Sequence, residues 1–223
     1  MIDLYTAVTP NGYKVSIMLE ECGLTYRPHY PDLAKLEHRR PEFLALNPNG
    51  RVPVIVDHEA GGFPVFESGA ILVYLARKTG RFCPADLKRN SSVMQWLMWQ
   101  MASLGPMMAQ LNVFIHLFPD RLPQVVTRYE RESYRLFGVM ESQLTKQPYL
   151  ACDEYTIADI ASWCWILSKD WSRLSLEAYP GIRRWFEEIG QRPAVVAGLR
   201  VPPVPGNDGT HDERIAGMRK TLA

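Results

Sequence analysis

Two short residue pairs, Val52-Pro53 and Glu67-Ser68, have the types and spacing that could do chemistry in this sequence. A cis Val52-Pro53 bond would turn the backbone N–H and C=O of Val52 outward, like the free edge of a strand. Only about 5–6% of X–Pro bonds are cis, so the surrounding sequence must decide whether this one is. Glu67-Ser68 opens a helix-like run, and the start of a helix offers unpaired N–H groups to a carboxylate. Together the two pairs predict a site that can hold a small peptide.

The four cysteines show no pattern that is typical of redox or metal chemistry. They are Cys22, Cys83, Cys152 and Cys164, and no two of them form a CxxC motif or have the spacing of metal ligands. We therefore expect four free thiols and no metal site. Cys22 and Cys164 are expected to be small apolar residues of the core.

Composition and charge limit the classes of function that the protein can have. The 223 residues suffice for one large domain or two small ones, and a hydrophobic content of 47% is enough for a core. The 25 basic and 24 acidic residues nearly balance, so a general electrostatic attraction to nucleic acid or anionic membrane has no support. No apolar run approaches the roughly 20 residues of a membrane span, and no secretory signal opens the chain. We expect a soluble cytoplasmic protein with no nucleic-acid or membrane partner.

The elements that must position the two pairs follow from hydrophobic periodicity and turn residues. Over about the first 80 residues the order is β-α-β-α-β-β-α, and the final hairpin makes the sheet mixed. This order fits a four-stranded thioredoxin-like fold and places both pairs at one end of a small sheet, which predicts a cis bond at Pro53. The predicted strands are 2–5, 26–30, 52–56 and 63–66. One predicted helix ends at Cys22, and two others span 41–44 and 68–77.

After a linker at residues 81–90 the pattern changes to helices only. Apolar residues recur at helical spacing over 94–108, and Pro106 predicts a kink or break in that helix. The same spacing returns over 123–146 and 180–190.

A capping-box pattern, Thr156 with Asp159, marks the start of another helix. Asp stands there in place of the usual Glu or Gln, and the pattern indicates a stable helix start with no catalytic role. The fold class is therefore α/β plus all-α. We expect a thioredoxin-like domain at 1–80, an all-helical bundle at 91–200 and an extended tail at 201–223.

This layout resembles the cytosolic glutathione transferase superfamily over residues 1–200. The resemblance rests on Val52-Pro53, Glu67-Ser68 and Thr156-Ile157-Ala158-Asp159, in that order and spacing. Further segments look like the bacterial nu-class proteins, which resemble yeast prion-type nitrogen regulators and act as glutathione-dependent disulfide-bond oxidoreductases. Those segments are 4–12, 66–71, 96–100, 104–107 and Arg128-Tyr129.

The resemblance implies that the bound peptide is glutathione, as substrate or cosubstrate. The carboxylate of Glu67 suits the γ-glutamyl amine, and the hydroxyl and N–H of Ser68 suit the γ-glutamyl carboxylate. The backbone of Val52, with Pro53 cis, would pair with the cysteinyl portion as a strand edge receives a peptide. His38 is a candidate for binding the glycine carboxylate.

Arg51, next to Val52, is a further candidate for the anionic end of the tripeptide. Each candidate also has a plainer interpretation. Taken alone, Glu67 is more often a solvated charge, His38 a surface histidine and Arg51 a side chain that faces solvent. The joint pattern favours the binding roles, more clearly for Glu67 and Ser68 than for His38.

A bound thiol must ionise before it attacks a disulfide. A free thiol has a pKa of about 8.5, and lowering it by two units requires about 2.7 kcal/mol of preferential thiolate stabilisation. Thr9 and Asn11 stand where the superfamily places its Tyr, Ser or Cys, and the helix beginning near Asn11 adds its positive end. No cysteine lies between Asp3 and Glu21, which argues against classes that use a protein thiol. Tyr5 falls inside the first strand and is expected to be packed.

The resulting prediction is a homodimeric glutathione-dependent disulfide-bond oxidoreductase, with room for weak peroxidase or transferase activity. Two glutathione thiols together are equivalent to one disulfide, so the reaction would be thiol–disulfide exchange. Arg128 is the candidate for the carboxylate of a second tripeptide, or else a surface arginine. Two alternatives stay open: a conventional transferase that conjugates glutathione to electrophiles, and a non-enzymatic glutathione-binding regulatory protein. The expected partners are glutathione and small disulfide or electrophilic substrates.

Overall fold

The computed structural model describes residues 1–203 of the chain. These residues form two units: 1–75 together with the segment from Pro193 onward, and 76–192. The expected domain boundaries at 80 and 91 stay a prediction. The tail expected at 201–223 lies, from residue 204 onward, outside the described residues.

A four-stranded mixed sheet organises the first unit, as predicted. The strand order is β2-β1-β3-β4, in which β1 and β2 are parallel and the other two pairings are antiparallel. The two central strands, β1 and β3, are the most deeply buried, because each is paired with a neighbouring strand on both edges. The strands are β1 (Ile2–Tyr5), β2 (Tyr26–His29), β3 (Val54–Asp57) and β4 (Phe63–Phe66).

Strand β3 begins at Val54, not at Val52 as predicted. Val54 lies opposite Tyr5 in the ladder with β1, and Val52 precedes this ladder. The shift has a direct cause, because Pro53 has no N–H to donate and so cannot take part in a central ladder. The predicted cis bond between Val52 and Pro53 is confirmed.

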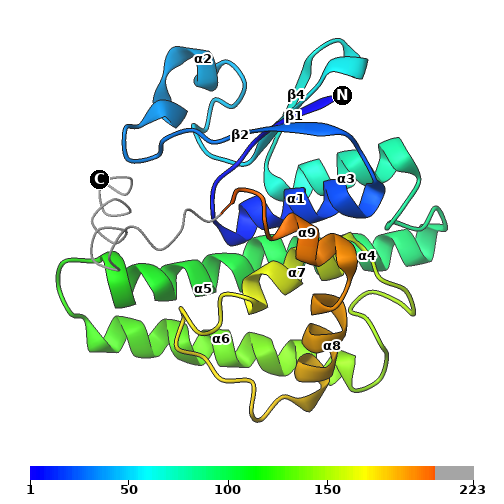
Figure 1. Cartoon of the computed structure of the whole chain (residues 1–223). Helices are drawn as coiled ribbons and strands as arrows, with labels where there is room; N and C mark the ends of the chain where they lie inside the picture. Colours follow the sequence, from blue (N-terminus) through cyan, green and yellow to red (C-terminus); the bar gives the residue numbers. More distant parts are fainter. Residues whose placement is uncertain (204–223) are drawn as a thin grey trace. The chain divides into compact units, whose positions relative to one another are not determined.

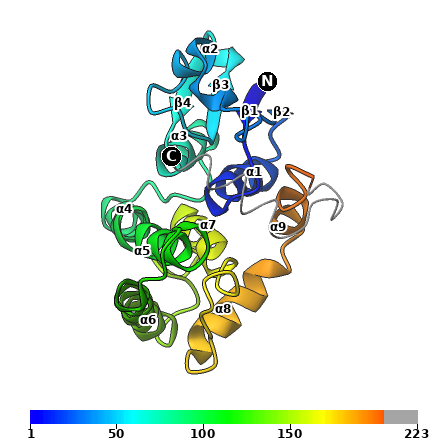
Figure 2. The same ribbon diagram turned by 90° about the vertical axis from the view of Figure 1, so that its left-hand side faces the viewer.

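Helices α1 (Pro10–Cys22) and α3 (Ser68–Thr79) lie on one side of the sheet, and α2 (Pro41–Leu44) lies on the other, as both views show (Figures 1 and 2). The left-handed Gly23, with φ of 65°, ends α1 as the sequence predicted. The last described helix, α9 (Pro193–Gly198), packs against α1 in the same unit. The hydroxyl of Ser16 in α1 donates to the carbonyl of Gly198 at 2.8 Å.

The second unit is built from helices. A π-helical segment, Gln100–Leu104, interrupts the long run near Pro106, which agrees with the predicted break because Pro106 lacks the N–H of a continuous α-helix. The first helix begins inside the predicted linker because the carboxylate of Asp86 caps it. No helix in the described part of the chain is long and apolar enough to cross a membrane. The helices are α4 (Leu87–Trp99), α5 (Gly105–Asn112), α6 (Pro123–Leu144), α7 (Ile157–Ile166) and α8 (Pro180–Gly190).

The capping box predicted at Thr156 and Asp159 is present at the start of α7. Asp159 is fully buried, and one of its carboxylate oxygens accepts from the N–H and the hydroxyl of Thr156, each at 3.0 Å. The other oxygen accepts from the N–H of Leu150 and from the indole of Trp185 in α8, each at 2.9 Å. One side chain therefore ties a loop and two helices together, which is a structural role.

We expect Asp159→Ala to lower the free energy of unfolding by roughly 3–5 kcal/mol, because four buried donors would lose their acceptor. Urea denaturation measures this change. The matched control is Asp153→Ala, since Asp153 is exposed and pairs only with Arg89 among the described residues. Its loss should cost at most about 1 kcal/mol. Equal effects of the two substitutions would contradict the role assigned to the network.

Candidate functional site

Three segments enter or leave the sheet at the same end of its strands. Tyr5 at the end of β1 lies opposite Val54 at the start of β3, and Val54 lies opposite Phe66 at the end of β4. Adjacent strands are about 4.8 Å apart, so this row spans roughly 10 Å, close to the length of an extended tripeptide. The residues predicted to act lie next to the row: Thr9 and Asn11 after β1, Val52-Pro53 before β3, and Glu67-Ser68 after β4.

Thr9 caps helix α1. Its backbone is extended, and its Oγ1 accepts the N–H of Gly12 at 3.0 Å. A hydroxyl that accepts one hydrogen bond still has a proton to donate. Thr9 can therefore hold the helix and donate to a bound thiolate at the same time.

Asn11 lies in the first turn of α1, where the helix dipole favours negative charge. The next residue, Gly12, lets this turn pack closely on the loop that follows β1. A Cβ at position 12 would lie against the carbonyl of Ala7 and 2.5 Å from the Oγ1 of Thr6. Gly12 was not among the predicted site residues, and its place beside Asn11 in a Pro-Asn-Gly turn was the available signal.

The loop that leads into Val52 is held by Asn47, which is buried. The Asn47 side chain donates to the carbonyl of Arg51 at 2.7 Å and accepts the N–H of Asn49 at 2.9 Å. Val52 itself is half-buried, and Arg51 is exposed. Asn47 was not predicted to support the site, although an Asn before a Pro-Asn-Gly run is typical of a side chain that stabilises a turn.

Glu67 has a left-handed backbone, with φ of 68°, which is uncommon for a residue other than glycine. Such strain is found at functional sites when the surrounding structure enforces it. The side chain of Glu67 is exposed, whereas Ser68, the first residue of α3, is buried with 3% of its surface accessible. The carboxylate of Glu67 and the N-terminal end of α3 are therefore adjacent, as the sequence predicted.

Lys14 in α1 contacts this helix start and was not predicted to belong to the site. It is fully buried, and its Nζ donates to the Oγ of Ser68 at 3.3 Å. A signal was present in the sequence, because Lys14 stands four residues before the apolar Met18 and so lies on the same face of α1.

His38 is buried, so its interpretation as a surface histidine is wrong. Burial lowers its pKa, and the positive charges of Arg39 and Arg51 lower it further, so the ring is neutral at pH 7. Its backbone carbonyl lies 3.1 Å from where a Cβ of Gly50 would be. The structure thus brings His38 to the loop that carries Arg51.

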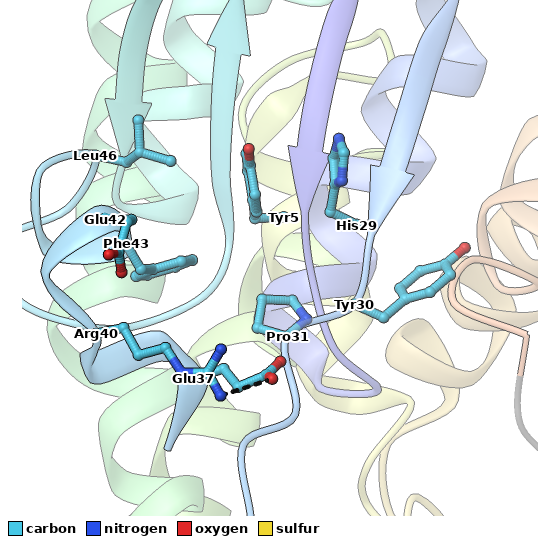
Figure 3. Close-up of a pocket in the computed structure, with 9 residues that line it drawn as sticks. All are labelled: Tyr5, His29, Tyr30, Pro31, Glu37, Arg40, Glu42, Phe43 and Leu46. Carbon is cyan, nitrogen blue, oxygen red and sulfur yellow. Dashed lines mark ion pairs between the residues drawn. The ribbon is translucent and has the colours of Figure 1, made fainter. Parts of the chain in front are cut away.

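A pocket of about 510 Å³ lies beside the row, between the ends of β1 and β2 and the segment 30–46 (Figure 3). Tyr5 is packed there as expected: its ring stacks on His29 at 4.6 Å and meets the edge of Phe43 at 5.9 Å. Arg40 forms an ion pair with Glu37 at 3.1 Å within the same pocket. None of the predicted site residues lines it.

Arg128 belongs to the second unit, on α6, and its side chain is 67% exposed. Its nearest charged partner in the described part of the chain is Glu132, at 3.9 Å. It lines a pocket of about 420 Å³ together with Met107, Gln124, Val125 and Tyr129. An exposed guanidinium beside an aromatic ring is suited to binding a carboxylate.

The four cysteines, all within residues 1–203, form no disulfide bond and carry thiols, as predicted. Cys164 is buried in α7, whereas Cys22, Cys83 and Cys152 are half-buried, so Cys22 is less enclosed than expected. Within residues 1–203 no group of His, Cys, Asp and Glu side chains could hold a metal ion.

Two family models match the chain. The glutathione S-transferase N-terminal domain matches residues 1–77, and the glutathione S-transferase C-terminal domain matches residues 100–193. The disulfide-bond oxidoreductase YfcG of Escherichia coli is 46% identical over 203 residues, which cover 89% of this chain and 94% of that protein.

Solved structures of glutathione transferases are also similar. One from Burkholderia graminis, with two glutathione molecules bound per subunit, is 40% identical with a TM-score of 0.84 and covers 92% of this chain and 89% of its own. One from Pseudomonas putida, with one glutathione disulfide bound per subunit, is 38% identical with a TM-score of 0.82 and covers 90% of this chain and 91% of its own.

We expect Gly12→Ala to destabilise the protein by about 1–3 kcal/mol, because the added methyl group overpacks the contact with the loop after β1. Gly138→Ala is the control, since Gly138 lies in α6 and no atom stands within 4 Å of its Cβ position. That substitution should be neutral or stabilising by up to about 1 kcal/mol. Thermal unfolding of both variants checks the difference, and a Gly12→Ala protein as stable as the parent would refute the close packing.

Proposed function

The chain belongs to the glutathione S-transferase family, and on this premise we propose that it is a glutathione-dependent disulfide-bond oxidoreductase that uses the thiol of bound glutathione. The observation that carries the proposal is the make-up of the loop after β1. It holds a hydroxyl, from Thr9, and an amide, from Asn11, at the start of a helix, and it contains no cysteine. The 46% identity with a disulfide-bond oxidoreductase supports the same reaction.

Glutathione would lie along the row formed by the ends of β1, β3 and β4. The Glu67 carboxylate would bind the γ-glutamyl amine, and the Ser68 hydroxyl with the N–H groups of α3 would bind the γ-glutamyl carboxylate. The backbone of Val52 would pair with the cysteinyl portion, because Val52 precedes the ladder of β3. This order directs the thiol towards the loop that carries Thr9.

The glycine carboxylate would be bound by Arg51 and His38. The lowered pKa of His38 means that its ring would act as a neutral donor, so the positive charge at this end would come from Arg51. Arg51 is exposed in the free protein, so its guanidinium is hydrated there and accessible to a ligand.

The reaction would be two successive thiol–disulfide exchanges. The glutathione thiolate attacks one sulfur of the substrate disulfide, the S–S bond breaks, and the departing thiolate takes a proton. A second glutathione thiolate then attacks the glutathione sulfur of the mixed disulfide, which yields glutathione disulfide and the second substrate thiol. Arg128 would bind a carboxylate of the second glutathione. Relatives crystallised with two glutathiones or with glutathione disulfide support this stoichiometry.

The protein would work as a cytoplasmic homodimer on small disulfide substrates. Met98 in α4 supports a subunit contact, because this apolar side chain is 49% exposed. Flexible methionine side chains adapt well to such contacts.

A cysteine-free variant tests the use of the glutathione thiol. Cys22, Cys83 and Cys152 are replaced by Ser and the buried Cys164 by Ala. We expect kcat/KM for hydroxyethyl disulfide reduction to stay within about threefold of the parent, because no cysteine of the protein takes part in the proposed exchange. Circular dichroism confirms the fold. Loss of activity in a folded cysteine-free protein would sink the mechanism.

Thr9→Val tests thiolate stabilisation, because it removes the donor. A hydrogen bond to a charged group contributes about 1.5–3 kcal/mol, so the pKa of the bound thiol should rise by about 1–2 units and the acid limb of the rate profile should shift equally. Thr9→Ser keeps both the helix cap and the donor and should retain the parent profile. An unshifted limb in Thr9→Val would show that the hydroxyl serves only as a cap.

A further inference from the structure

Lys14 is a fully buried lysine beside the proposed γ-glutamyl subsite. Lysine is almost never fully buried unless it is paired, because removing an ammonium from water is costly. Its Nζ is 3.3 Å from the Oγ of Ser68, which is itself buried at the start of α3. A buried lysine that donates to the hydroxyl proposed to bind a carboxylate points to a role in the site and not only in the core.

We infer that Lys14 is a positioning residue that orients the Ser68 hydroxyl and supplies positive charge for binding the γ-glutamyl carboxylate of glutathione. The inference rests on the proposed function and names a residue that acts through another. Lys14 itself would not touch the ligand.

The hydrogen bond sets the direction of the hydroxyl. An ammonium has three donors and no acceptor, so Ser68 must accept from Lys14. The Ser68 proton therefore points to an acceptor other than Lys14, and in the complex that acceptor is the γ-glutamyl carboxylate. The donor is oriented before the ligand arrives, which reduces the ordering that binding would otherwise require.

The charge acts on the same oxygen atoms. A carboxylate that accepts from Ser68 at about 2.7 Å lies at most about 6 Å from the Nζ of Lys14. Because Lys14 is buried, solvent and salt screen this attraction much less than they would screen a surface pair. The N-terminal end of α3 adds its own positive potential at the same point.

The experiment compares two ligands on Lys14→Met. One is glutathione, and the other is 4-aminobutyryl-Cys-Gly, which keeps the amine but lacks the γ-glutamyl α-carboxylate. Calorimetry should show a 10- to 100-fold weaker Kd for glutathione and less than about a twofold change for the analogue. Ser68→Ala should show the same selectivity, and the double variant should lose less than the product of the two single losses.

Lys88→Met, a change at an exposed position on α4, is the matched control and should bind both ligands as the parent does. Lys14→Gln, a neutral donor, replaces Lys14→Met should that variant not fold, as judged by urea unfolding. Unchanged glutathione affinity, or an equal loss for both ligands, would overturn the inference. Failure of the parent protein to bind glutathione would instead refute the proposed function.

Discussion

The register of the central strands places Tyr5, Val54 and Phe66 side by side, and the contacts proposed for Val52, Glu67 and Ser68 with the first glutathione start from this row. Because neighbouring strands keep a nearly constant spacing, the segments next to the row would hold the γ-glutamyl portion, the cysteinyl backbone and the cysteinyl thiol at fixed distances from one another. A shift of one residue in the pairing would turn the side chains of a strand to the opposite face and move its terminal loop. The buried, apolar β1 and β3 make such a shift costly.

Several polar side chains around this row are buried. Burying a polar group without a hydrogen bond costs free energy, so these side chains are held in place by hydrogen bonds. Lys14 donates to Ser68 in the interior, and the side chain of Asn47 holds the loop before Val52. Gly12 allows the first turn of α1 to approach the preceding loop more closely than any side chain would permit. These contacts orient donors before a ligand binds, so less conformational entropy is lost on binding. The second unit uses the same principle for stability at Asp159, to which no chemical role is assigned.

Much of the fold could be read from local signals. The Pro-Asn-Gly turn, the double glycine before β4 and the capping box at Thr156 act over a few residues, so their outcome is nearly independent of the rest of the chain. The beginning of β3 could not be predicted as accurately, because Val52 and Val54 have equal strand propensity and only pairing with β1 separates them. The π-helical segment before Pro106 likewise depends on packing within the second unit.

The sequence by itself determined the absence of a cysteine from the loop after β1 and the order of the elements, because turn residues and hydrophobic periodicity act locally. That order in turn predicted the cis bond before Pro53. Only the tertiary structure decided the environment of individual side chains. It buried His38, which makes the ring neutral, and it brought Lys14 to Ser68 across 54 positions of sequence. Burial and charge proximity arise from segments that are distant along the chain, and residue identity alone does not contain them.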